Sequence, residues 1–212
     1  LLSSYTNKAL DNILLKLLQI HPTLKIIRLG TPQSVTDPKL LKITLQNICQ
    51  YRGEESYLQG KQFIDPLKVR MVLDKAEIIA ATTTTAGSSL MQNYHFDTVV
   101  LDEAGQIVET SALIPLVKGE HFVLVGDHMQ LPPIDSSPSF DANEISREDL
   151  SLLNLEPKLG LKKSIFERLV EKYQETPIFH LLSHQYRMNR IISEFISQTF
   201  YQNKLQCGTI QG

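Results

Sequence analysis

FDTVVLDEAGQ, residues 96–106, is the stretch that decides the expected fold. Residues 99–101 form a short apolar run rich in β-branched side chains, which predicts a buried strand. Two carboxylates, Asp102 and Glu103, follow at the point where this strand should end. Because open α/β sheets bind ligands at the carboxyl ends of their strands, the pair predicts a polar site at that edge.

The two acids suit different tasks in phosphate chemistry. Asp102 could hold a divalent metal on phosphates, because Mg²⁺ takes one or two protein carboxylates and keeps water at its other positions. Glu103 could orient or deprotonate an attacking water. Alternatively, both acids only open the next helix, where the helix dipole favours negative charge. Such dipeptides are common, so the pair alone leaves both interpretations open.

A second apolar run, HFVLV at residues 121–125, is also followed by polar residues, in the sequence GDHMQLPP. Two neighbouring strands would then deliver polar groups to one crevice. Gln130 is a neutral donor and acceptor, and it could touch both a phosphate and the attacking water. In the alternative interpretation, Asp127 is only a turn residue after a strand.

The composition excludes some functional classes. The 212 residues are 42% hydrophobic and carry a net charge of -2, which is typical of one globular domain and part of another. The pI near 6.3 gives no bulk charge for binding nucleic acid, so such binding would need local surfaces and backbone amides. Cys49 and Cys207 lack the spacing of a zinc site or a disulfide framework. We therefore expect an intracellular protein, nuclear or cytoplasmic.

Neither the apolar runs nor the first residues indicate a membrane protein. No run approaches the roughly 20 residues of a membrane span. The start, LLSSYTNKAL, has no Met and no charged region of a signal peptide, and it resembles the end of a strand. We expect the sequence to be part of a longer chain with further domains.

The first part of the chain predicts alternating helices and strands. Thr6 or Asn7 can cap a helix, because a short side-chain oxygen accepts from the free amides of the first turn. Pro22 ends this helix. Its apolar face comprises Leu10, Ile13, Leu14, Leu17 and Leu18. Residues 24–29 and 77–81 are the next strand candidates, so the alternation predicts an α/β fold with a parallel sheet flanked by helices.

The last part of the chain continues this alternation. Ser164 and Glu167 form an S-x-x-E capping box, which predicts a helix start. Residues 178–182 predict a strand, QYRM follows at residues 185–188, and a last helix is expected from about Asn189. The predicted buried face of that helix comprises Ile191, Ile192, Phe195 and Ile196.

Three segments between these elements have less regular patterns. Residues 31–74 predict an inserted helical excursion, with helical spacing at residues 39–51. Residues 82–89, TTTTAGSS, offer amides and hydroxyls for phosphate oxygens, although the same residues also favour strands and helix caps. The long polar connection at residues 134–163 is of a kind that is usually functional or disordered.

Several sequence blocks together resemble the 5′-to-3′ branch of the superfamily 1 helicases. The blocks are TNKALDNILLKL, VVLDEAGQ, LVGDHMQLPP, SIFERL and QYRMNRIISEFISQTFYQNKL, in this order. Within this branch, SYTNKALDNILLKL, RLG and FYQNKLQCG look most like the replication nuclease-helicases, and the group also includes the helicase of nonsense-mediated decay. The resemblance implies a RecA-like first domain at residues 1–175 and the start of a second RecA-like domain at residues 176–212.

The resemblance also implies a role for each residue of an ATP site. Asp102 would hold Mg²⁺ on the nucleotide phosphates, and Glu103 would position the hydrolytic water. Gln130 would contact the terminal phosphate, and Arg187 would reach it from the second domain as an arginine finger, for which a planar, permanent charge is suited. Tyr186 would stack on the base, which needs a flat apolar partner. In the alternative interpretation, QYRM is a helix entry with a surface arginine.

The other implied partner is single-stranded nucleic acid. The resemblance implies that four residues contact the nucleic-acid backbone: Thr6, Asn7, Thr82 and Thr83. The choice between DNA and RNA stays open, because contacts of this kind can be made to either polymer.

One motif of the family is absent from the sequence. No G-x-x-x-x-G-K-[ST] occurs, and Gly60-Lys61-Gln62 lacks the hydroxyl and a preceding strand. In the family this loop cradles the phosphates and precedes SYTNKAL. We therefore expect these 212 residues alone not to hydrolyse ATP.

Three hypotheses follow from the sequence. The chain is the interior of an ATP-dependent helicase, or a helicase-derived nucleic-acid-binding or scaffold module without ATPase activity, or an unrelated α/β enzyme with Asp102 and Asp127 as a metal pair. The joint presence of Asp102, Glu103, Gln130 and Arg187 favours the first.

Overall fold

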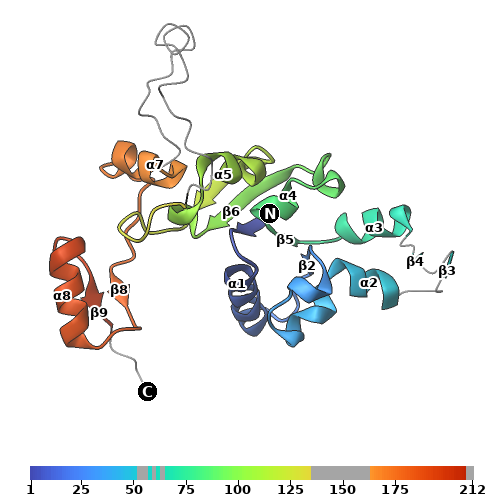
Figure 1. The fold of residues 1–212 in the computed structure, drawn as a ribbon, viewed down its shortest axis with the longest axis horizontal. Coiled ribbons are helices and arrows are strands. Elements are labelled where there is room, and N and C mark those ends of the chain that lie inside the picture. Colours follow the sequence, from blue (N-terminus) through green and yellow to red (C-terminus); the bar gives the residue numbers. More distant parts are fainter. Residues whose placement is uncertain (52–56, 59–60, 63–64, 135–162, 209–212) are drawn as a thin grey trace, which may run out of the picture.

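A five-stranded sheet forms the centre of the computed structural model, which describes residues 1–51, 57–58, 61–62, 65–134 and 163–208. The strand order is β2-β5-β1-β6-β7, and every neighbouring pair is parallel (Figure 1). The strands are β1 (Leu2–Ser4), β2 (Ile26–Arg28), β5 (Ile78–Thr82), β6 (Phe96–Asp102) and β7 (Gly119–Leu124). The predicted parallel α/β fold of RecA-like type is confirmed.

Helices cover both faces of this sheet because successive strand residues alternate between the faces. On one face, Leu2 and Ala80 pack with α1 (Asn7–Ile20) and the 3₁₀ segment η2 (Pro38–Ile43). On the other, Val99 and Leu101 pack with the remaining helices near the sheet. These are α2 (Leu45–Tyr51), α3 (Pro66–Leu73), α4 (Thr83–Ala86) and α5 (Glu109–Leu116). Figure 1 shows α1 and α5 on opposite sides of the sheet.

A buried ion pair ties α1 to the end of β2. The predicted cap of α1 is confirmed, since Thr6 Oγ1 accepts a hydrogen bond from Ala9 N at 3.2 Å. Arg28 is fully buried, and its Nε donates to Asp11 Oδ1 at 2.8 Å. Its remaining N–H groups donate to Leu29 O, Ser34 Oγ, Ser34 O and Asn7 Oδ1. The guanidinium is therefore saturated with acceptors, as a buried charge requires.

Asp11→Ala is expected to lower the free energy of unfolding by about 3–5 kcal/mol, because it leaves the Arg28 guanidinium buried without its counter-charge. The substitution also removes the acceptor of Thr36 N, at 2.6 Å from Asp11 Oδ2. Urea denaturation measures the change. The matched control is Arg70→Ala, which breaks an exposed pair with Asp74 at 3.7 Å and should change stability by less than about 0.5 kcal/mol. Equal losses in both variants would contradict this prediction.

The inserted segment is helical but more divided than its pattern predicted. The helix expected at residues 39–51 splits into η2 and α2, because Thr44 between them has an extended backbone. The Thr44 hydroxyl donates to Leu41 O, which ends the first turn, and it accepts from Asn47 N, which starts the next helix. A short antiparallel pair, β3 (Tyr57–Leu58) with β4 (Lys61–Gln62), was not predicted. Of the predicted polar connection, residues 135–162 lie outside the described residues.

The capping box near the end of the chain is confirmed. Ser164 caps α7 (Ile165–Tyr173), and its Oγ accepts from Glu167 N at 3.0 Å. The strand predicted at residues 178–182 is wrong, because the chain there has no neighbouring strand to pair with among the described residues, and Leu182 is exposed. The strand lies instead at β8 (His184–Gln185), which pairs with β9 (Gln206–Cys207).

The predicted buried face of the last helix is also wrong. In α8 (Arg190–Phe200), Ser193 and Ser197 are the buried residues, whereas Ile191 and Phe195 are 81% and 65% exposed. Ile192 is exposed too, and only Ile196 is half-buried. The described chain that packs on α8 comes mainly from β9, on the serine side of the helix. We refer to β8, α8 and β9 together, residues 184–208, as the C-terminal unit.

No helix in the described part of the chain has both the length and the apolar character needed to cross a bilayer. The division into residues 1–175 and 176–212 stays a prediction.

Candidate functional site

The two acids of the opening stretch lie at the carboxyl edge of the sheet. Asp102 is the last residue of β6 and is half-buried. Glu103 has a left-handed backbone, with φ 56° and ψ 32°, which ends the strand and starts the 3₁₀ turn η4 (Ala104–Gln106). The acids therefore do not open an α-helix, since α5 begins only at Glu109. A left-handed non-glycine residue costs about 1–2 kcal/mol and often marks a functional position.

Two glycines bring the loops after β6 and β7 into direct contact. A Cβ on Gly105 would lie 2.7 Å from Asp127 O, and one on Gly126 would lie 2.8 Å from Gly105 N. Ala104 N donates to Val125 O at 2.9 Å across the same contact. The close approach places Asp127 beside the two acids. The role of these glycines was not predicted from the sequence, although a glycine within three residues of the end of a strand is a signal for close backbone approach.

The Asp127 carboxylate accepts three hydrogen bonds. Its Oδ1 accepts from Met129 N at 3.0 Å. Its Oδ2 accepts from Gln130 Nε2 at 2.8 Å and from the Tyr201 hydroxyl at 2.5 Å. The side chain of Gln130 is thus oriented by Asp127. With three donors on its carboxylate, Asp127 is poorly suited to the metal pair with Asp102 that one hypothesis required.

The site carries an excess of negative charge. Burial raises the pKa of Asp102, while the hydrogen bond from the Glu103 backbone and the charge of Lys16 lower it. Burial also raises the pKa of Glu103, as do the charges of Asp102 and Asp127, and Arg187 opposes the increase. Partly buried carboxylates without a saturating set of donors fit a hard cation such as Mg²⁺. Among the described residues, no cluster of three or more His, Cys, Asp or Glu side chains could hold a metal ion.

Arg187 and Tyr186 lie on a loop that is held by the preceding residue. Gln185 Oε1 accepts from Arg187 N at 2.9 Å and from Met188 N at 2.7 Å, and Gln185 Nε2 donates to Met188 O. Arg187 is near enough to Glu103 to lower its pKa. Tyr186 is 61% exposed, and its ring lies against Gly208, where a Cβ would be only 2.2 Å from ring atom Cε1. The charge of Arg187 is thus felt by Glu103, and the ring of Tyr186 is accessible.

The four residues predicted to contact nucleic acid lie at the same edge of the sheet, because Ser4 is in register with both Thr82 and Asp102. Thr6 is exposed, and Thr82 caps α4 with its hydroxyl. Asn7 Oδ1 is taken by Arg28, and Thr83 is buried, 1% exposed. Contact with a nucleic-acid backbone stays a prediction for all four, and the geometry favours Thr6 over Thr83.

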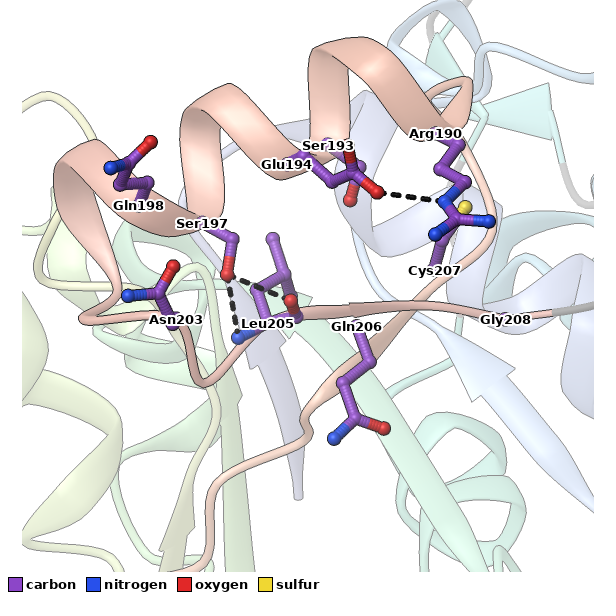
Figure 2. Close-up of a pocket in the computed structure, with 10 residues that line it drawn as sticks. All are labelled: Arg190, Ser193, Glu194, Ser197, Gln198, Asn203, Leu205, Gln206, Cys207 and Gly208. Carbon is purple, nitrogen blue, oxygen red and sulfur yellow. Dashed lines mark hydrogen bonds and ion pairs between the residues drawn. The ribbon is translucent and has the colours of Figure 1, made fainter.

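An open pocket of about 670 Å³ lies away from these residues, between α8 and β9 (Figure 2). Its lining includes Arg190, Glu194 and Gln206, and none of the predicted site residues. Arg190 and Glu194 form an exposed ion pair along α8 on one side of the pocket. Because neither the acids nor Arg187 lines this pocket, the chemistry is expected at the sheet edge instead.

Comparison with known proteins places this geometry in a family. Two family models, each described as an AAA domain, match residues 54–138 and 161–211. An uncharacterized ATP-dependent helicase of Methanocaldococcus jannaschii is 40% identical over 135 residues, 64% of this chain. A DNA replication ATP-dependent helicase/nuclease of Homo sapiens is 35% identical over 99% of this chain, and one of Arabidopsis thaliana is 31% identical over 100%.

The chain spans 17%, 17% and 13% of the length of these three relatives, respectively. The matched residues include both the strand-end acids and the QYRM loop. The chain therefore belongs to the superfamily 1 helicases, in the group that contains the replication helicase/nucleases.

Proposed function

We propose that this chain is the interior part of an ATP-dependent helicase that translocates along single-stranded nucleic acid. ATP would be hydrolysed at the cleft between two RecA-like domains, to which residues 1–175 and 176–212 belong. The observation that carries the proposal is that Asp102 and Glu103 end β6 at the sheet edge, where the loop carrying Asp127 packs against theirs and the charge of Arg187 lowers the pKa of Glu103. A scaffold without ATPase activity has no need of this arrangement.

Each residue of the site has a task in the proposed reaction. Asp102 would hold Mg²⁺ on the nucleotide phosphates, where the cation neutralises phosphate charge. Glu103 orients the attacking water and accepts its proton, and Gln130 contacts the terminal phosphate. Arg187 stabilises the charge that develops on the transferred phosphoryl group, and Tyr186 stacks on the base.

The phosphate-binding loop would come from sequence outside these 212 residues. The outer edge of β7 supports this proposal, because no strand of the described residues pairs with it and Phe122 and Val123 are 53% and 50% exposed. An edge strand with exposed apolar side chains is a template for a further strand. In the longer relatives, additional sequence is present to supply one.

Nucleic-acid-dependent ATP hydrolysis tests this proposal. The full-length protein should hydrolyse ATP faster with single-stranded DNA or RNA than with a blunt duplex or with no nucleic acid. We expect DNA to be effective, since the relatives are named for DNA replication. The 212-residue chain should show no turnover under the same conditions, because it lacks the phosphate-binding loop. A full-length protein without ATP turnover would support the scaffold alternative instead.

A further inference from the structure

A tyrosine of the C-terminal unit contacts the acid that holds Gln130. The Tyr201 hydroxyl donates to Asp127 Oδ2 at 2.5 Å, across 74 positions of sequence. The same oxygen accepts from Gln130 Nε2 at 2.8 Å. One carboxylate oxygen therefore joins the C-terminal unit to the amide that is proposed to contact the terminal phosphate.

The position of Tyr201 is fixed within the C-terminal unit. It follows α8 directly, and the next two residues, Gln202 and Asn203, have positive φ angles of 52° and 62°, which turn the chain back sharply. Asn203 N donates to Ser197 O at 3.0 Å. Ser197 Oγ donates to Leu205 O at 2.8 Å and accepts from Leu205 N at 3.1 Å, as Figure 2 shows.

The strand after this turn leads back to Arg187. In β9, Cys207 is paired with Gln185 of β8, and Gly208 N donates to Gln185 O at 2.8 Å. Gln185 in turn holds the backbone of Arg187. Tyr201 and Arg187 are therefore parts of one hydrogen-bonded unit.

We propose that Tyr201 is a positioning residue for ATP hydrolysis, whose hydrogen bond to Asp127 sets the C-terminal unit so that Arg187 reaches the site while Gln130 is held. This inference rests on the proposed function. Tyr201 acts through Asp127 and Arg187 and does not itself contact the nucleotide. The contact makes the approach of the arginine and the orientation of Gln130 one event.

The protonation of the Tyr201 hydroxyl supports this positioning role. Burial raises the pKa of Tyr201 to about 12, together with the hydrogen bond and the charge of Asp127. At neutral pH the hydroxyl therefore stays protonated and donates to the carboxylate. Hydrogen bonds to a charged group are roughly twice as strong as those between neutral groups.

The test is Tyr201→Phe in the full-length protein, which removes the hydroxyl and keeps the ring. Turnover at saturating ATP and nucleic acid should fall about tenfold, while KM for ATP changes less than about twofold, because nucleotide binding does not need the contact. The matched control is Tyr94→Phe. It also removes a tyrosine hydroxyl that donates to an aspartate, Asp74 at 3.3 Å, and turnover should stay within about 1.5-fold of wild type.

A double variant distinguishes a positioning role of Tyr201 from a role in protein stability alone. When Tyr201→Phe is introduced into the Arg187→Ala variant, turnover should fall further by less than about twofold, because the arginine that Tyr201 positions is no longer present. Wild-type turnover in Tyr201→Phe, or an equal loss in both backgrounds, would overturn the inference and leave the proposed function intact. A wild-type protein without nucleic-acid-stimulated turnover would overturn both.

Discussion

Glu103→Gln in the full-length protein is expected to lower ATP turnover about 1,000-fold, while the affinity for ATP stays within about threefold of wild type. The amide keeps the size of the side chain but cannot accept a proton from water. The left-handed backbone at Glu103 is retained, so the loop after β6 should keep its shape. Steady-state hydrolysis and binding of a fluorescent ATP analogue measure the two quantities separately.

The control for this variant is Glu109→Gln. Glu109 lies at the start of α5 and pairs with Arg168 at 3.0 Å, outside the acid cluster. The same chemical change there should alter turnover less than about twofold. Retained turnover in Glu103→Gln would contradict the role assigned to Glu103, and weakened nucleotide binding would show that this residue contributes to binding.

Arg187→Ala is expected to lower turnover about 1,000-fold at saturating ATP, because arginine fingers contribute on this scale to phosphoryl transfer. Arg187→Lys should recover only a small part, since an ammonium group lacks the planar, bidentate geometry of a guanidinium. The control is Arg190→Ala, which removes an exposed arginine three positions away that pairs with Glu194. Turnover in that control should be close to wild type.

The pH dependence gives Arg187→Ala a second measurable consequence. The positive charge of Arg187 opposes the increase in the pKa of Glu103 that burial, Asp102 and Asp127 cause. Without Arg187, the pKa of Glu103 should rise further, so the carboxylate is protonated up to a higher pH. The acid limb of the turnover profile should therefore move to higher pH. An unmoved limb together with unchanged turnover would show that Arg187 does not approach Glu103.

Local sequence patterns were sufficient to predict the sheet and the edge of the sheet at which the candidate site lies. The apolar runs before Asp102 and Asp127 predicted adjacent strands, and these are β6 and β7. The caps at Thr6 and Ser164 were also predicted, because a cap depends on residues within one turn. The roles of the site residues themselves remain proposals.

Features that depend on distant residues could not be predicted in this way. The full burial of Arg28 requires the Asp11 carboxylate from another element, and the hydrogen bond of Tyr201 spans two parts of the chain. The exposed face of α8 is a related case. Its spacing indicates which side chains favour burial, but burial also needs neighbouring elements, and those among the described residues cover Ser193 and Ser197 instead.

The backbone contact between the loops after β6 and β7 leaves no room for a side chain at two positions. A Cβ on Gly105 or Gly126 would lie 2.7 or 2.8 Å from backbone atoms of the other loop, and backbone cannot turn aside as a flexible side chain can. Alanine at either glycine would therefore have to push the two loops apart and change the separation between Glu103 and Asp127. The distance between these two acids thus depends on two residues that carry no functional group themselves.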